Sequence, residues 1–361
     1  MKTPNTRTIV QEIYDNNIKI TDVQLAEEIL KYPELTPLDL WLLPQYPFNI
    51  WRRKYDYPRL LESIKRRRKD FIDWMNDQGI TDDYLLNGYF SDFFNYKPLS
   101  PDKQKHLVKV TWEGKTELQS WDNYKKSYEE EGDGSVQYEY IKAYISYYDW
   151  ILIRTKTRFN FMNQLDRYEP NTDEEYVYVN IDFRMLKMGA MEPPTNALGV
   201  MLRGKTLEFV NASGLSLNGH IRFGDMGNLE FSHSAVDNLK CNELLMYPLK
   251  FENCSIRNIQ VKNSDITSWL FVNSIVSGNI IDSKLSRFRI FGGKFNPIFA
   301  NSEIDFWEVV HKDVEHESDF EKTYRTLSKA AYDSGNKELA ADYKMKNLNL
   351  YETVKKELRS V

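Results

Sequence analysis

The sequence predicts an α+β protein in which a mainly helical N-terminal domain precedes a short β-solenoid and a C-terminal helical cap. Three observations support this prediction: an apolar residue at every fifth position between 221 and 281, helix-capping signals on both sides of that stretch, and an aromatic content of 14%. The 361 residues, of which 41% are hydrophobic and 28% charged, can bury a sizeable core. We divide them into an aromatic-rich helical domain (1–165), a connecting strand region (166–203), the solenoid (204–306) and C-terminal helices (307–361).

The five-residue period is the strongest signal in the chain. Because about 41% of the residues are apolar, thirteen successive apolar residues at this spacing arise by chance with odds on the order of one in a hundred thousand. An α-helix repeats every 3.6 residues and a strand every two, so neither produces this pattern. This first row consists of Ile221, Met226, Phe231, Val236, Cys241, Met246, Phe251, Ile256, Val261, Ile266, Phe271, Val276 and Ile281.

A second row lies two residues before the first and is small or apolar throughout. The positions between the rows are polar, as in Glu252-Asn253 and Lys262-Asn263, and after Ile281 the register slips by one residue. The two rows together place two small or apolar residues in every five along this stretch. The second row consists of Leu229, Ser234, Leu239, Leu244, Leu249, Cys254, Ile259, Ser264, Trp269 and Ser274.

These rows resemble the repeat of the pentapeptide-repeat family, which has a large apolar residue at its centre and a small or apolar residue two positions earlier. The resemblance covers residues 204–306 and implies a right-handed quadrilateral β-helix with four repeats per coil. About 100 residues would then form roughly five coils, and a spacing of about 4.8 Å gives a rod on the order of 24 Å long. Because Trp269 is large for the second row, we expect a bulge there.

Some pentapeptide-repeat proteins carry a strongly negative rod that resembles duplex DNA. Between residues 221 and 305 this chain has nine acidic and nine basic residues, so its rod is neutral. We therefore do not expect DNA mimicry.

The flanking segments carry helix and strand signals. Thr21 with Gln24 and Ser318 with Glu321 are capping boxes, and Gly335 is typical of a left-handed helix end. A hairpin is predicted around Glu113-Gly114-Lys115. The remaining predictions are a helix from Thr36-Pro37, a longer helix from Pro58 to Met75, a long tyrosine-rich helix over 136–165 and a strand over 176–183.

A basic cluster with interleaved aromatic residues is the candidate macromolecule-binding site. Cations beside aromatic rings suit single-stranded nucleic acid, and an acidic protein partner would satisfy the same charges. Acidic residues nearby, such as Asp70 and Asp73, leave open a solvated helix face with no partner. The candidates are Arg52, Arg53, Lys54, Arg59, Lys65, Arg66, Arg67, Arg68 and Lys69, with Trp51, Tyr55 and Tyr57 among them.

No catalytic, cofactor-binding or metal-binding residues are assigned, because phosphate-binding loops and a nucleophile elbow are absent from the sequence. Cys241 and Cys254 fall on the inward rows, and His220 and His233 are expected at the surface. The acidic stretch from His311 to Glu317 is interpreted as a solvated turn. The net charge of −5 gives no general attraction to nucleic acid or membranes.

The function expected is therefore a non-catalytic, cytoplasmic scaffold or adaptor that binds another protein, with homodimerisation through the C-terminal helices as a further expectation. A nucleic-acid-binding protein and an enzyme with an unfamiliar site in 1–165 remain the alternatives. No apolar run is long enough to span a membrane.

Overall fold

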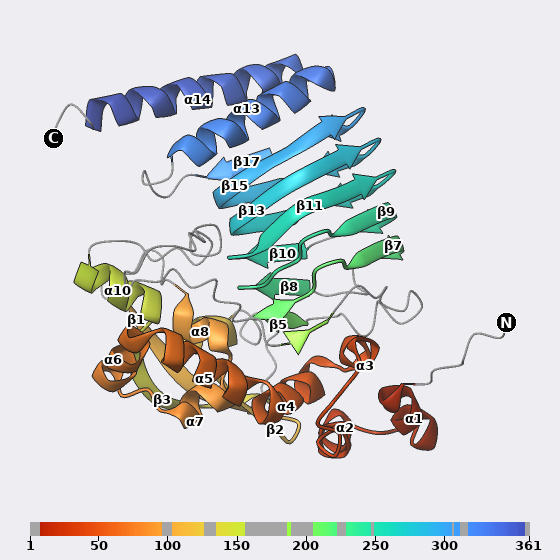
Figure 1. Cartoon of the computed structure of the whole chain (residues 1–361), viewed down its shortest axis with the longest axis vertical. Coiled ribbons are helices and arrows are strands. Elements are labelled where there is room, and N and C mark those ends of the chain that lie inside the picture. Colours follow the sequence, from red (N-terminus) through yellow and green to blue (C-terminus); the bar gives the residue numbers. More distant parts are fainter. Residues whose placement is uncertain are drawn as a thin grey trace. The chain divides into compact units, whose positions relative to one another are not determined.

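The computed structural model describes residues 8–95, 103–125, 135–155, 186–188, 205–221, 229–246, 249–304, 307–310 and 317–357. The chain forms two compact units, and each is treated by itself. Unit 1 consists of Met1–Leu35 with Leu43–Leu186, and unit 2 of Thr36–Leu42 with Lys187–Val361. Helices, a parallel β-solenoid and C-terminal helices follow one another along the chain (Figure 1), which is the predicted α+β class.

Unit 1 contains short helices whose starts follow the predicted capping signals. Thr21 and Gln24 form a full capping box, as do Thr8 and Gln11. The helix predicted from Pro58 to Met75 is instead two helices, because Arg68 between them has an extended conformation and its Nε donates to Asp70 Oδ1 (2.9 Å). The helices are α1 (Ile9–Asn16), α2 (Asp22–Ile29), α4 (Gln45–Tyr55), α5 (Tyr57–Arg67), α6 (Lys69–Gln78), α7 (Asp82–Asn87), α8 (Phe90–Phe94), α9 (Trp121–Tyr124) and α10 (Tyr147–Thr155).

A three-stranded antiparallel sheet with the order β2-β1-β3 completes unit 1. The predicted hairpin is confirmed as β1 (Gln104–Trp112) and β2 (Lys115–Ser120). The long helix predicted over 136–165 is wrong, since residues Gln137–Ile145 form β3 and α10 begins only at Tyr147. Tyrosine favours strands, and pairing with β1 overrides the helical spacing of these rings. The strand predicted over 176–183 lies outside the described residues.

Aromatic rings form much of the core of unit 1. Phe71 of α6 stacks on Phe94 of α8 with ring centroids 5.5 Å apart, and Trp74 and Tyr147 lie 5.1 and 5.2 Å from Phe71. Offset and edge-to-face arrangements of this kind add stability beyond area burial. The high aromatic content of the sequence therefore serves packing to a large extent.

Unit 2 is built around a β-solenoid of about four turns with parallel stacked strands. Successive strands of one face lie in register, for example Leu229 beside Leu249 and Leu249 beside Trp269. This is fewer than the five turns predicted. The first turn is longer than the next, since Thr206 pairs with Glu230, 24 residues further on, whereas Leu229 pairs with Leu249, 20 residues further on. The strands are β5 (Thr206–Glu208), β6 (Val210–Asn211), β7 (Ser216–Ile221), β8 (Leu229–Ser232), β9 (Lys240–Met246), β10 (Leu249–Glu252), β11 (Ser255–Lys262), β12 (Asp265–Thr267), β13 (Trp269–Ile281), β14 (Lys284–Ser286), β15 (Phe288–Ala300), β16 (Glu303–Ile304) and β17 (Trp307–Val310); β4 (Leu186–Lys187) pairs with β6.

The first predicted row forms the dry interior of the solenoid. Nine of its thirteen members are at most 2% exposed: Phe231, Val236, Cys241, Phe251, Ile256, Val261, Ile266, Phe271 and Val276. Ile281 is a correction, because it is half-buried and its neighbour Ile280 takes the inward position. The register slip therefore lies near Gly278, where the pairing with β11 loses one residue, and not after Ile281. Met226 lies outside the described residues, as do the side chains of Ile221 and Met246.

All ten members of the second row are buried as well. Trp269 is 1% exposed, and its ring stacks on Phe288 of the next turn with centroids 5.7 Å apart and planes 7° from parallel. The predicted bulge is wrong, because Trp269 pairs with Leu249 in an unbroken register. The indole therefore packs between Leu249 of the preceding turn and Phe288 of the next.

At the corners of the solenoid, residues with a left-handed backbone conformation recur about every five positions. One corner, for example, stacks Glu243, Asn263, Asp282 and Asn301, whose φ values lie between 48° and 50°. Asparagine and aspartate tolerate this conformation better than other side chains, which accounts for the polar residues between the two rows. Other corner residues with positive φ are Phe209, His233, Asn238, Asn253, Asn258, Ser268, Asn273 and Arg287.

Serine residues of the second row satisfy the backbone at these corners. Ser264 Oγ donates to Lys262 O (2.8 Å) and accepts from Leu244 N of the preceding turn (3.1 Å). Ser274 Oγ likewise donates to Val272 O (3.0 Å) and accepts from Cys254 N (3.1 Å). Each buried hydroxyl thus bonds two turns together and leaves no polar backbone group unpaired at that point.

Helices cover the solenoid within unit 2. The short helix α3 (Pro37–Leu42) belongs to this unit, and Lys205 Nζ donates to its carbonyl at Leu40 (2.7 Å). Near the other end, α13 (Glu317–Asp333) packs on β15, where Thr323 Oγ1 accepts from Phe295 N (3.1 Å), and α14 (Lys337–Glu357) packs on α13. The predicted left-handed Gly335 separates the two helices. Since α13 begins at Glu317, Ser318 lies inside its first turn, and its side chain lies outside the described part.

We expect Asn258→Val to destabilise unit 2 by about 1–2 kcal/mol, because a β-branched side chain at a φ of 58° clashes with its own backbone. Asn258→Gly should cost a few tenths of a kcal/mol or less, and Gln260→Val, at an exposed strand position, is the matched control. Urea denaturation of the three variants measures these differences. An equal loss in Asn258→Val and Gln260→Val would contradict the role of the corner conformation.

Candidate functional site

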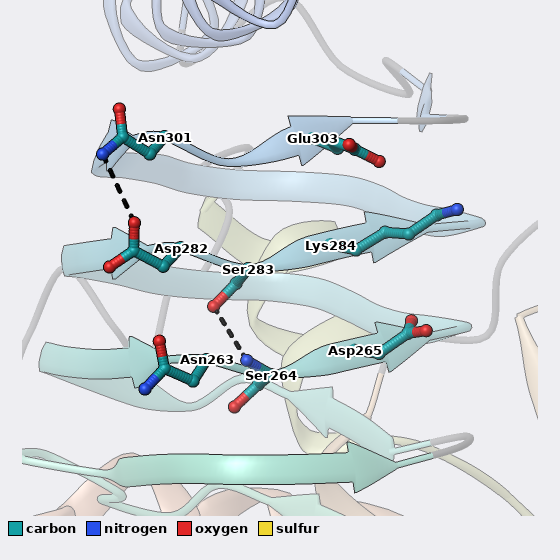
Figure 2. A pocket seen from close by; sticks show the side chains of 8 residues that line it. All are labelled: Asn263, Ser264, Asp265, Asp282, Ser283, Lys284, Asn301 and Glu303. Carbon is teal, nitrogen blue, oxygen red and sulfur yellow. Dashed lines mark hydrogen bonds between the residues drawn. The ribbon is translucent and has the colours of Figure 1, made fainter.

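The solenoid carries an open groove of about 500 Å³ on the face formed by β12, β14 and β16. Figure 2 shows its walls, which are three stacked copies of one short polar segment. The lining residues are Asn263, Ser264, Asp265, Asp282, Ser283, Lys284, Asn301 and Glu303. These positions follow directly from the five-residue repeat, since each segment holds a corner residue, an inward serine and an outward charged residue.

Several polar groups of the groove lie next to a group of opposite charge or hydrogen-bond to one another. Asp265, Lys284 and Glu303 occupy equivalent positions on neighbouring strands, so an acid, a base and an acid alternate along the face. Asn301 Nδ2 donates to Asp282 Oδ1 at 3.3 Å, and Ser264 N donates to Ser283 Oγ at 3.2 Å (Figure 2). The described part of the chain contains no group of three or more metal-ligating side chains. With three carboxylates and one ammonium group in its lining, the groove is an open polar surface with a net negative charge.

The basic cluster separates into buried and exposed members. Arg52 is fully buried, its Nε donates to Asp56 Oδ2 (2.7 Å), and its guanidinium lies 4.7 Å from the centre of the Tyr57 ring. Arg53 bonds Glu117 Oε1 through Nη2 (3.0 Å). Lys65 pairs with Asp82, and Arg68 contacts Asp70 and the Tyr147 hydroxyl. These four cations belong to the structure of unit 1.

The aromatic residues of the cluster are also engaged within the unit. Trp51 is 6% exposed and its Nε1 donates to Tyr32 O (2.8 Å), Tyr55 Oη donates to Leu30 O (2.6 Å), and Tyr57 is 1% exposed. Lys54 lies near Leu30 O (3.4 Å), and Arg67 is half-buried. Arg59, Arg66 and Lys69 are exposed and, among the described residues, form no ion pair.

A buried polar network joins α4 to β2 and is the part of unit 1 that sequence reasoning missed. Glu117 Oε1 accepts from Arg53 and from Asn49 Nδ2 (3.2 Å), and its Oε2 accepts from the Tyr89 hydroxyl (3.1 Å). Gln45 Nε2 donates to Asn49 Oδ1 (3.0 Å). Within the sequence, only the spacing of Gln45, Asn49 and Arg53 on one helix face signals this network, and nothing in that spacing identifies Glu117 as its partner.

Other buried titratable groups are explained by packing. Burial raises the pKa of the thiols of Cys241 and Cys254, so both remain protonated and behave as small apolar side chains. His233 is a correction, because it is fully buried at a corner, where its ring stacks on Phe209 (4.8 Å) and Nδ1 lies 2.8 Å from Ser232 Oγ. The side chain of His220 and residues 311–316 lie outside the described part.

In comparisons with known proteins, no family model, curated protein or solved structure matches the chain. Among the described residues, no helix has both the length and the apolar character that crossing a membrane requires.

We expect Glu117→Ala to destabilise unit 1 by about 3–5 kcal/mol, because it leaves the buried guanidinium of Arg53 without its counter-charge. Glu113→Ala, at a carboxylate that is 75% exposed on the same hairpin, should change stability by less than about 0.5 kcal/mol. Urea denaturation followed by tryptophan fluorescence measures both. A loss below about 1 kcal/mol for Glu117→Ala would show that the network contributes little.

Lys205 predicts a pH dependence of stability. Its ammonium group is fully buried against Leu40 O, and burial lowers its pKa from 10.5 to about 7. Between pH 7 and 10.5 the unfolded chain therefore binds the proton that the folded chain lacks. The free energy of unfolding should rise with pH over this window by up to about 1.4 kcal/mol per pH unit. Below pH 7 both states bind the proton, so Lys205 adds no further pH dependence there.

Urea denaturation at pH 6, 7, 8 and 9 tests this sign. Lys205→Met should remove the rise between pH 7 and 9, whereas Lys240→Met, at an exposed strand position, should retain it. If the free energies of unfolding of the wild-type chain and Lys205→Met changed with pH in the same way, the buried amine of Lys205 would not be neutral in the folded chain.

Proposed function

We propose that the chain is a non-catalytic adaptor whose solenoid, of the pentapeptide-repeat type, is a rigid support for protein-binding surfaces. The observation that carries this proposal is the filled interior of the solenoid. The nine buried members of the first row and all ten of the second are packed within it, which leaves that third of the chain as scaffold. Its parallel ladders and five-residue corners agree with the family's repeat.

The surface chemistry supports binding more than catalysis. In the described part of unit 1, the buried charges Arg52, Arg53 and Glu117 are each held by one another or by a neighbouring acid. The open groove on the solenoid is lined by three carboxylates, one ammonium group and neutral polar side chains. Neither arrangement holds a nucleophile beside a base with space for a substrate.

The contact surface we assign to unit 1 is the exposed side of α5 and the start of α6, marked by Arg59, Arg66 and Lys69. These three cations lie outside the ion pairs that hold the unit together. Exposed positive charges that form no ion pair within the described part of the chain attract an acidic protein surface and accelerate its association. The partner proposed is therefore an acidic protein.

Nucleic-acid binding by the basic cluster stays the alternative prediction. The positions of its aromatic rings do not favour it. Stacking of single-stranded bases needs exposed rings, and Trp51, Tyr55 and Tyr57 are packed or hydrogen-bonded inside unit 1. The enzyme alternative in 1–165 likewise stays open to an activity screen.

The test is quantitative affinity capture from the native host with the full chain and two variants. Arg59→Glu/Arg66→Glu/Lys69→Glu should lose about tenfold or more of the specifically captured acidic protein, because attraction becomes repulsion. Lys240→Glu/Lys262→Glu/Lys284→Glu, a matched reversal of three exposed charges on the solenoid, should retain it.

Equal capture by both variants would contradict the assigned surface. Binding of a short single-stranded oligonucleotide that only the α5 variant loses would favour the nucleic-acid alternative. Turnover that one polar substitution in 1–165 abolishes would overturn the adaptor proposal.

A further inference from the structure

Among the described residues, nothing pairs with the outer edge of the unit 1 sheet along the first half of β3. The sheet order is β2-β1-β3, and among the described residues no strand pairs with the outer side of β3. Its second half is covered by the end of α6, because Ile145 N donates to Gln78 Oε1 (2.7 Å) and Lys142 Nζ donates to Gly79 O (2.8 Å). The segment from Gln137 to Ile141 has no such cover in the described part.

This open half carries two large aromatic side chains in solvent. Tyr138 is 53% exposed and Tyr140 is 57% exposed, although tyrosine rings usually bury most of their area. Tyr138 is held in place by Trp121 and Tyr124, whose ring centroids lie 4.8 and 4.9 Å away. These ring contacts therefore fix the position of Tyr138 at the edge.

Open edges of this kind invite strand pairing, and proteins usually protect them with proline or lysine. The segment Gln137-Tyr138-Glu139-Tyr140-Ile141 has neither residue. Its one charged residue, Glu139, lies 3.8 Å from Lys109 of β1 on the same sheet. The sequence therefore leaves the edge able to accept another strand.

The partner that this edge fits is a second copy of itself. A two-fold axis brings an antiparallel strand against its own copy, so the N–H and C=O groups of one edge meet the complementary groups of the other. A register centred on Tyr138 places Gln137 opposite Glu139 of the second copy, and Tyr140 opposite Val136. A register centred on Glu139 would instead place two carboxylates opposite each other, which is destabilising.

We propose that the chain forms a homodimer by antiparallel pairing of β3 with β3 of a second copy, centred on Tyr138. The two three-stranded sheets then form one continuous sheet, and Tyr138 and Tyr140 of both copies become buried along it. This surface differs from the C-terminal helices, which the sequence suggested for dimerisation. It is also separate from the α5 surface assigned to the acidic partner, so each can fail without the other.

Cysteine cross-linking of the full chain tests the register. Residues directly opposite in an antiparallel pair have Cα atoms about 4.5–5.5 Å apart, within the range that a disulfide spans. Tyr138→Cys should therefore form a disulfide-linked dimer under mild oxidation, since Cys241 and Cys254 are buried and do not compete. Glu113→Cys, exposed at the hairpin tip of the same sheet, is the control and should remain monomeric on a non-reducing gel.

Light scattering and sedimentation measure the dimer without a cross-link. Tyr138→Lys should raise the dimer dissociation constant at least about tenfold, because two ammonium groups then meet at the two-fold axis. Leu348→Lys, at a residue 51% exposed on α14, should leave the dimer intact. Circular dichroism and the urea midpoint verify that both variants fold.

Three results would overturn the proposal. One is a wild-type chain that is monomeric at high micromolar concentration. Another is a dimer that Leu348→Lys dissociates and Tyr138→Lys does not, which would assign the interface to α14. The third is cross-linking of Glu113→Cys as efficient as that of Tyr138→Cys, which would indicate random collision.

Discussion

The constraint on which the solenoid depends is the left-handed backbone turn that recurs about every five residues. A turn at Asn253, Asn258 and Asn263 leaves four residues between corners, of which two point inward. The stacking of these turns then brings chemically similar residues above one another, as in Phe231, Phe251 and Phe271, whose rings lie 5.4–5.5 Å apart and nearly parallel. The corner conformation therefore determines both the apolar columns and the polar surface.

The same constraint explains why serine alternates with large apolar residues in the second row. At one set of corners, backbone groups of the neighbouring turn need hydrogen-bond partners from a small inward side chain. Ser264, Ser274, Ser283 and Ser302 meet this need, and each donates to the carbonyl two residues earlier in the chain. At another position of the coil, Leu249, Trp269 and Phe288 stack on one another instead. The interior thus has two kinds of column in one coil.

The repeat could be predicted from the sequence because its signal is local and periodic. The apolar rows, the capping box at Thr21 and the hairpin at Gly114 each depend on residues close in the chain. The failures involve contacts distant in sequence: β3 was predicted as helix because only pairing with β1 makes it a strand, and Trp269 fits because Phe288 lies on the next turn. Ile281 was misplaced since a one-residue deletion at a corner becomes visible only when turns are aligned.

The candidate site shows the same limit more sharply. Nine cations within 18 residues are alike in the sequence, yet their roles depend on acids elsewhere, because Glu117 is 64 residues from Arg53 and Asp82 is 17 from Lys65. A buried guanidinium is stable only with such a partner, so Arg52 and Arg53 are fixed by folding. Arg59, Arg66 and Lys69 are not held in this way. Their positive charge is therefore the part of the cluster that a partner can still use.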